Sequence, residues 1–181
     1  MGGRLTQVAT LLSLLLTISQ DTSASLAPTT FEDLVRDSSL IVIARSQESR
    51  VVDFAAGRAK LKTDRVLRGR WPGPFITLEW TEEVHDQRIR RVGEAYLLFL
   101  RAEGNRYVGT HYGRSYWPMD YTKERKEFIE YIYPVTYVKV PGSLLADVER
   151  MEEAWPGAPR TCTIKGILLD RVITYIEATV K

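Results

Sequence analysis

The side chains most able to bind a metal ion or move a proton are gathered in the segment Glu82-Glu83-Val84-His85-Asp86. Imidazole and carboxylate groups are ordinary ligands of divalent cations, so His85 and Asp86 are candidate metal ligands. His111 is the only other histidine in the chain, and a barrel of strands could bring it close to His85. The spacing matches neither a zinc-protease His-Glu pattern nor an EF-hand loop. A polar turn without a ligand explains the same residues.

Patterns typical of nucleophilic or phosphate-binding enzymes are missing from the sequence. It contains no Gly-x-Ser-x-Gly, no Ser-x-x-Lys and no glycine-rich loop followed by Lys-Ser or Lys-Thr. Cys162, the single cysteine, has no recognisable histidine partner nearby in the sequence. We therefore expect a protein without catalytic activity and without a cofactor. The alternative is a metal-dependent or hydrolytic enzyme that uses His85 and His111.

Basic and aromatic residues are interleaved between residues 45 and 114, where 12 Arg and 2 Lys face 9 acidic residues. Basic surfaces lined with aromatic rings bind oligosaccharides or oligonucleotides, because rings stack and cations attract acidic groups. The ordinary alternative is a solvated Arg-rich surface with the aromatic rings in the core. The six candidate ligand-binding residues are Arg88, Arg90, Arg91, Tyr112, Tyr116 and Trp117, with Trp71, Trp80 and Tyr107 as further aromatic residues in the same region.

The amino-terminal residues predict export. A positive start at Met1–Arg4 is followed by an apolar run from Val8 to Ile18 and by the small residues Ser23-Ala24-Ser25, which is the pattern of a signal peptide over residues 1–24. The run is too short to span a bilayer, and no second run approaches that length. We therefore expect a soluble secreted or periplasmic protein. Because such a protein meets envelope polymers, the expected partner is a glycan or an acidic protein surface, not nucleic acid.

Removal of residues 1–24 leaves 157 residues, a normal size for one domain with a real core. One cysteine cannot form a disulfide within the chain, so this core has to stabilise the exported domain. Cys162 could instead link two chains into a homodimer. The alternative is a half-buried structural thiol close to the start of a helix.

Turn residues divide the chain into short elements. Thr30 and Asp33 form a capping-box pattern for a helix over residues 31–36. The runs at 40–44 and 96–100 are apolar at every position and predict strands buried on both faces. A hairpin over 49–67, a turn at 69–74 and strands at 75–81 and 106–112 complete the expected strands. Beyond them, the patterns predict helices over 122–131, 144–154 and 166–180, and a strand over 135–140.

Four segments carry a resemblance to a known family: Leu40-Ile-Val-Ile-Ala44, Asp64-Arg-Val-Leu-Arg-Gly69, Val92-Gly-Glu-Ala-Tyr-Leu-Leu-Phe-Leu100 and Asn105-Arg-Tyr-Val108. Their order resembles that of the netrin-like or metalloproteinase-inhibitor-like family. The resemblance implies an α+β fold, with a five-stranded OB-type barrel over residues 40–113 and helices packed outside it. It also implies an amino-terminal cysteine and several disulfides, which this chain lacks. The expected domain is therefore a single OB-like barrel with C-terminal helices over residues 25–181, without the family's inhibitory mechanism.

Overall fold

The structure is a computed structural model that describes residues 29–51, 57–71, 73–80, 89, 92–122, 124–131, 135–154 and 158–179. Eleven strands lie within these residues: β1 (Thr29–Thr30), β2 (Leu40–Val51), β3 (Gly57–Arg68), β4 (Phe75–Trp80), β5 (Ala95–Glu103), β6 (Arg106–Gly109), β7 (Tyr116–Tyr121), β8 (Glu127–Glu130), β9 (Val138–Lys139), β10 (Leu145–Ala154) and β11 (Ala158–Leu168). The described helices are α2 (Phe31–Asp37), α3 (Leu169–Thr179) and the short 3-10 helices η1 (Tyr112–Ser115), η2 (Val135–Tyr137) and η3 (Gly142–Leu144).

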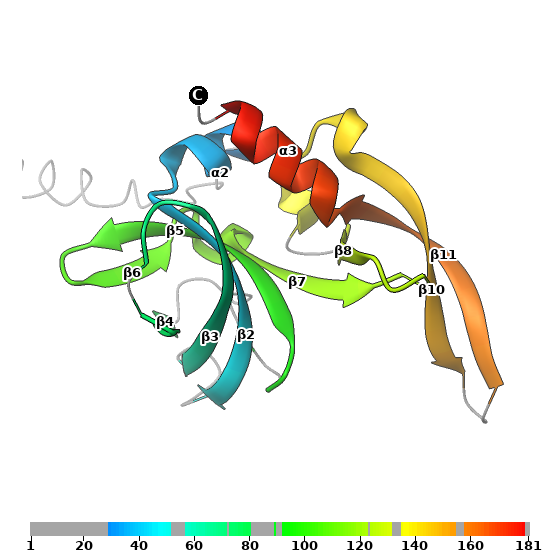
Figure 1. Ribbon diagram of the computed structural model, residues 1–181, viewed down its shortest axis with the longest axis horizontal. Helices are drawn as coiled ribbons and strands as arrows, with labels where there is room; N and C mark the ends of the chain where they lie inside the picture. The colour runs from blue at the N-terminus through cyan, green and yellow to red at the C-terminus, as the bar shows by residue number, and fades with distance from the viewer. Residues whose placement is uncertain are drawn as a thin grey trace, which may run out of the picture.

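Nine of the strands form one antiparallel sheet. Its order is β10-β11-β8-β7-β5-β2-β3-β4, and β6 pairs with β5 beside β7. The remaining two strands, β1 and β9, form a small parallel pair. The sheet is strongly bent: β2, β3 and β4 curl below the helices while β10 and β11 project as a long arm on the other side (Figure 1). The β2–β3 register shifts at three places, and such bulges increase local twist and bending.

Strands β2 and β5 lie at the centre of the sheet and bury both of their faces. Side chains that alternate along each strand enter two separate cores. Helices α2 and α3 cover the first core, above the sheet in Figure 1. This helix-side core includes Phe31, Leu34, Ile41, Ile43, Leu97, Phe99, Trp117, Ile129, Ile167, Val172 and Ile176.

The curl of the sheet encloses the second core. Here β3 and β4 fold over the opposite face of β2 and β5, so the strands themselves cover the apolar side chains. This curl-side core consists of Leu40, Val42, Ala44, Ala59, Leu61, Ile76, Leu78, Ile89, Tyr96, Leu98, Leu100 and Tyr116, with Trp71 and Tyr107 packed against it.

The predictions for the first half of the chain are largely confirmed. Thr30 and Asp33 form the capping box of α2, and the predicted buried runs lie within β2 and β5. The predicted strand at 75–81 is β4, and the strand predicted at 106–112 is confirmed as far as Gly109. The local sequence pattern is enough to predict these elements, because the apolar runs and the turn residues indicate the same elements.

The expected fold class is wrong in two respects. The curled strands do not close into a barrel: among the strands that the structure describes, β4 pairs only with β3, and β6 pairs only with β5. The C-terminal part is not mainly helical either, because the described chain is mostly strand. Barrel closure depends on the register between strands far apart in the sequence, which local patterns do not determine.

Two of the expected helices are strands. Of the expected helix over 144–154, residues 145–154 form β10, and residues 127–130 of the expected helix over 122–131 form β8. The last helix, α3, begins only at Leu169. The sequence of β10 is rich in Glu, Ala, Leu and Met, which favour helices. Its partner β11 contains Thr161, Thr163 and Ile164, and β-branched residues favour strands. Pairing with β11 overrides the helical preference, and it places Cys162 within a strand instead of near a helix start. The strand expected at 135–140 is reduced to η2 and the two residues of β9.

None of the described helices combines the length and the apolar character needed to cross a membrane.

Gly69 provides a test of the turn between β3 and β4. It has a φ of +82°, and a Cβ atom there would clash with the Ser39 carbonyl oxygen at the start of β2. We expect Gly69→Ala to lower the free energy of unfolding by about 2 to 4 kcal/mol, from the positive φ and the clash together. Gly104→Ala is the matched control, because Gly104 has a φ of +62° with no atom within 4 Å of its Cβ position. Urea unfolding that gives equal losses for both variants would contradict this packing.

Candidate functional site

A groove lies where the curled sheet fails to close, between the edge strand β4 and the hairpin strand β6. Its volume is about 280 Å³. We call it the seam groove. Its lining residues are Trp71, Phe75, Ile76, Thr77, Glu79, Asn105, Arg106, Tyr107 and Val108.

The two strands that border the seam groove do not pair with each other, although their Cα atoms approach within 8 Å. Strands that pair directly lie 4.7 to 4.9 Å apart. The curl therefore brings β4 near β6 and stops short of a hydrogen-bonded ladder. What remains is a shallow cleft over the curl-side core.

Two aromatic rings meet at this seam. Trp71, just before β4, and Tyr107, on β6, pack edge to face with ring centroids 5.3 Å apart and an interplanar angle of 76°. Both rings rest on the curl-side core and remain partly exposed. The Trp71 indole nitrogen is buried and has no hydrogen-bond partner among the described residues. A buried donor without an acceptor costs about 1 to 3 kcal/mol.

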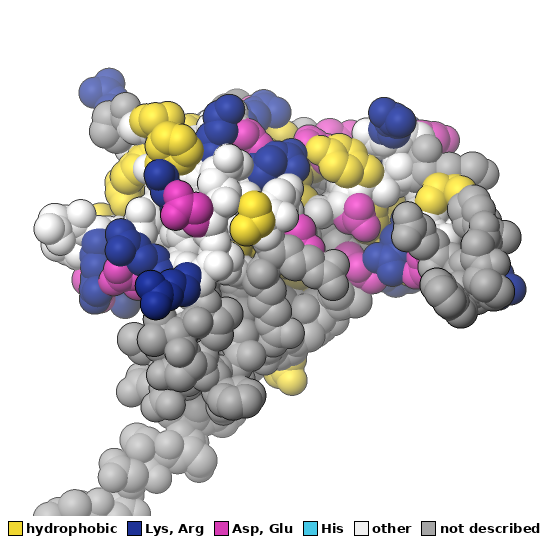
Figure 2. Space-filling model, turned by 90° about the horizontal axis from the view of Figure 1, so that it is seen from below, with side chains coloured by type: hydrophobic (Ala, Val, Ile, Leu, Met, Phe, Trp, Pro, Cys, Tyr) yellow, Lys and Arg dark blue, Asp and Glu magenta, His cyan; other side chains and the backbone are white. Residues whose placement is uncertain are grey.

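Polar side chains surround the aromatic pair. Glu79, Asn105 and Arg106 line the groove, and all three are exposed. The Arg106 guanidinium donates to Glu103 from Nε at 3.2 Å and Nη2 at 2.8 Å, which positions it beside the groove. Figure 2 shows Lys and Arg side chains gathered, with acidic side chains among them, at the end that carries the β5–β6 hairpin. An apolar surface with a few polar groups at its border is typical of a small-ligand site.

Most of the residues predicted from the sequence as ligand-binding or metal-binding lie outside the described part of the chain. They are His85, Asp86, Arg88, Arg90 and Arg91, together with the side chain of Tyr112. Their predicted roles stay predictions.

Tyr116 and Trp117 are described, and both are buried. Trp117 is fully inaccessible in the helix-side core, where its indole nitrogen donates to the Arg114 carbonyl oxygen at 2.7 Å. Tyr116 points into the curl-side core, and burial raises the pKa of its hydroxyl to about 12, against the opposing effect of a hydrogen bond with the Gly109 backbone. Consecutive residues of β7 thus supply the two cores, and neither ring is available to a ligand.

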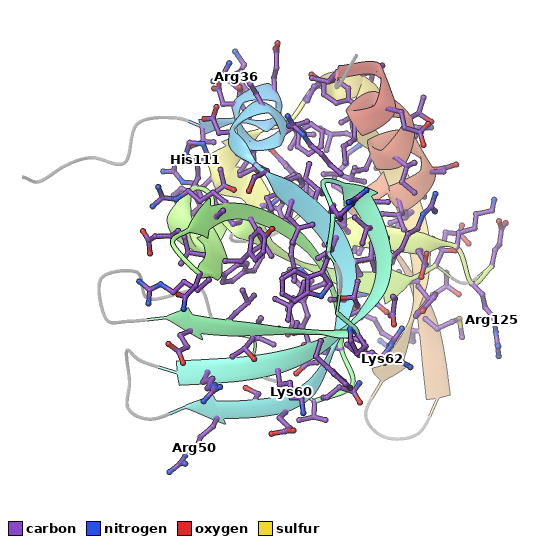
Figure 3. All side chains as sticks on the ribbon, turned by 60° about the vertical axis from the view of Figure 1, so that its left-hand side comes forward. Arg36, Arg50, Lys60, Lys62, His111 and Arg125 are labelled. Atoms are coloured by element: carbon purple, nitrogen blue, oxygen red, sulfur yellow. The ribbon has the colours of Figure 1, made fainter. Side chains whose placement is uncertain are left out.

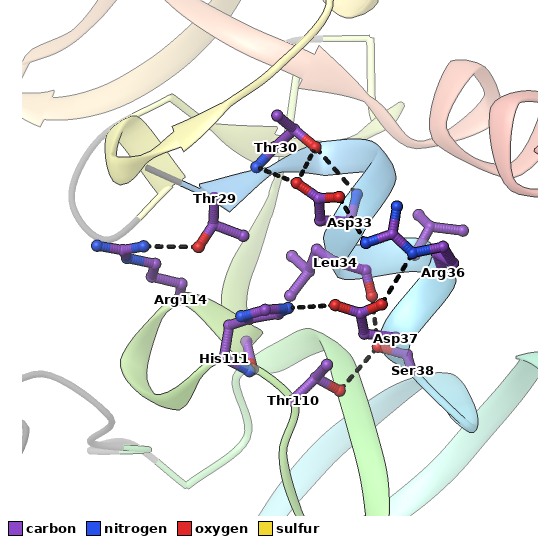
Figure 4. Close-up of polar contacts among 12 residues, drawn as sticks. Thr29, Thr30, Asp33, Leu34, Arg36, Asp37, Ser38, Thr110, His111 and Arg114 are labelled. Atoms are coloured by element: carbon purple, nitrogen blue, oxygen red, sulfur yellow. Dashed lines mark hydrogen bonds and ion pairs between the residues drawn. The ribbon is translucent and has the colours of Figure 1, made fainter. Parts of the chain in front are cut away.

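His111 connects two elements of the fold. Its Nε2 lies 3.0 Å from Asp37 Oδ2 at the end of α2, and its backbone N–H donates to Ser115 Oγ at 2.8 Å. Thr110 and Ser38 pair beside it, with their hydroxyl oxygens 2.8 Å apart (Figure 4). No group of three potential metal ligands occurs among the described residues. The contacts of His111 are those of a tether between the β6–η1 segment and α2.

Sequence reasoning missed most of the seam groove. It identified Trp71 and Tyr107 as aromatic residues near basic ones, but it did not assign them to the site. A local signal for Trp71 exists: it lies within the turn sequence Gly69-Arg-Trp-Pro-Gly-Pro74, where a large ring cannot belong to a regular strand face. No comparable local signal indicates that β6 lies next to β4.

The variant His111→Ala distinguishes between two roles of this residue, a structural tether and a metal ligand. Because the imidazole and the Asp37 carboxylate are both about one-third exposed, we expect His111→Ala to lower the free energy of unfolding by no more than about 1 kcal/mol. EDTA is expected to leave the unfolding curves of the wild type and the variant unchanged. Metal bound at one equivalent by the wild type and lost in His111→Ala, measured by elemental analysis, would contradict the tether and support the enzyme alternative.

No protein-family model matches this chain, and no curated protein is similar to it. The functional conclusion therefore depends on the seam groove and on the chemistry of the residues that line it.

Proposed function

We propose that this chain is an exported, non-catalytic binding protein that holds a glycan in the seam groove. The observation that carries the proposal is the Trp71–Tyr107 pair, two partly exposed rings set in a groove with a polar border. Exposed aromatic residues in a groove supply large contact areas at a small cost in conformational entropy.

The chemistry of the lining suits a sugar. A pyranose ring has an apolar face of C–H groups, which can pack on an aromatic ring, and hydroxyl groups at its edge. The side chains of Glu79, Asn105 and Arg106 provide both acceptors and donors for those hydroxyls. A ligand of this kind uses the apolar floor and the polar border at once.

The width of the seam favours a sugar over a peptide strand. A strand inserted between β4 and β6 would need about 10 Å between them, which is twice the usual spacing. Their Cα atoms approach within 8 Å, so a strand would have to separate them further. A sugar needs no backbone ladder and can enter from the open side.

The described lining argues for binding without catalysis. Glycoside hydrolysis ordinarily uses two carboxyl groups on either side of the scissile bond. Glu79 is the single carboxylate among the described lining residues, and no histidine or cysteine accompanies it there. The predicted signal peptide over residues 1–24 supports the choice of ligand, because an exported protein meets envelope or extracellular polysaccharides.

Trp71→Ala and Tyr107→Ala test the proposed function. Affinity electrophoresis of the protein lacking residues 1–24, through gels containing soluble polysaccharides, is combined with pull-downs on insoluble cellulose, chitin and peptidoglycan. We expect retention by at least one of these polymers, and a loss of tenfold or more in affinity for each variant, which is about 1.4 kcal/mol. Removing the ring removes the main apolar contact with the sugar.

The matched control is Tyr121→Ala, because Tyr121 is 44% exposed on β7 and does not line the groove. It is expected to bind like the wild type, and circular dichroism checks that each variant is folded. Failure of every polysaccharide to retain the wild type, or retention that is unchanged in Trp71→Ala, would overturn the proposed function.

A further inference from the structure

A second hollow lies beside the seam groove, on the outer side of the β2–β3 hairpin. Its volume is about 570 Å³, and we call it the basic hollow. Figure 3 shows Arg50 and Lys60, two of its residues, on neighbouring strands of this hairpin. Its lining residues are Glu48, Ser49, Arg50, Arg58, Lys60 and Thr77.

Like charges are placed together in this hollow. Arg50 and Arg58 lie directly opposite each other in the β2–β3 register, an arrangement that destabilises a pair of strands. Lys60 follows two residues after Arg58 on the same face of β3. The hollow therefore presents three cations, against one carboxylate, Glu48, in its described lining.

The carboxylates near these cations neutralise them only weakly. Arg58 pairs with Glu79 at 3.7 Å and Lys60 pairs with Glu48 at 3.5 Å, and all four side chains are substantially exposed. Exposed pairs at such distances contribute little. Arg50 has no carboxylate within 4.0 Å among the described residues. An anion that entered the hollow would meet an available guanidinium and relieve the repulsion between Arg50 and Arg58.

The basic hollow and the seam groove adjoin each other at β4. Thr77 on β4 lines both of them. Lys60 of the hollow places its Nζ 4.7 Å from the ring centroid of Phe75, which lines the groove. A chain of sugars can therefore lie in the groove and extend an acidic substituent into the hollow.

We infer that the ligand is an acidic polysaccharide, whose sugar ring occupies the seam groove and whose carboxylate group occupies the basic hollow. This inference rests on the proposed function and names the class of glycan. An acidic protein surface would satisfy the cations equally well, but it would make no use of the Trp71–Tyr107 pair beside them.

The inference is tested with acidic polysaccharides and their uncharged forms. The acidic probes are polygalacturonate, alginate and hyaluronan, and each is compared with its methyl ester, which has the same backbone without the charge. We expect at least one acidic form to bind ten times more tightly than its ester in 20 mM salt. The difference should largely disappear in 0.5 M NaCl, because salt screens exposed charges.

Substitution of two basic residues tests whether the basic hollow causes the preference for the acidic form. Arg50→Gln combined with Arg58→Gln is expected to remove the tenfold preference while changing ester binding less than twofold. Lys62→Gln is the matched control, because Lys62 is exposed on the same strand and does not line the hollow. It should keep at least half of the preference.

Three other outcomes would contradict the acidic class, the glycan class or the proposed function. If the esters bound as tightly as the acids, and if this binding were lost in Trp71→Ala, the acidic class would be overturned. The proposed function would remain supported. Absence of binding by every acid and ester would overturn the acidic class. If cellulose, chitin and peptidoglycan also failed to retain the protein, the proposed function would be overturned as well. Binding of poly-L-glutamate as tight as that of the acidic polysaccharides, and independent of Trp71, would show an acidic protein partner and overturn the glycan class.

Discussion

The structure depends on two strands that are apolar on both faces. Every residue from Leu40 to Ala44 and from Ala95 to Leu100 is buried, so β2 and β5 need apolar cover above and below. Helices α2 and α3 cover one face. Because no further helix in the described chain covers the other face, the sheet has to bend until β3 and β4 lie over it. Both cores, and the curl itself, follow from the need to bury these two strands.

The seam groove is a consequence of that curl. Bending the sheet far enough to enclose the second core brings the edge of β4 towards β6, and the large rings of Trp71 and Tyr107 meet there. The seam thus has an aromatic floor supported by a rigid core, and its border comes from the exposed faces of β4 and β6. The same bend places the outer face of the β2–β3 hairpin, with Arg50 and Arg58, next to the groove. One constraint accounts for both parts of the proposed site.

The sequence predicts the elements that local chemistry determines. The capping box at Thr30, the apolar runs of β2 and β5, and the turn at Gly69 are each recognisable from a few neighbouring residues. It does not predict β10, because Leu145–Ala154 favours a helix until β11 pairs with it. Nor does it predict the open seam, since the distance between β4 and β6 depends on how the whole sheet bends. The candidate site is missed for the same reason: its residues come from separate strands, and only the fold brings them together.

In our proposal, one acidic glycan occupies the seam groove and the basic hollow together. Backbone amide NMR spectra of the protein, recorded during titration with a galacturonate hexamer and with an alginate hexamer, show which residues such a glycan contacts. The predicted result is that the largest shifts for at least one hexamer fall on Trp71, Thr77 and Tyr107 and also on Arg50 and Arg58, with one common dissociation constant. If the largest shifts fell on α2, α3 or the β10–β11 arm, the proposal would be contradicted. Spectra that neither hexamer changes would contradict it as well.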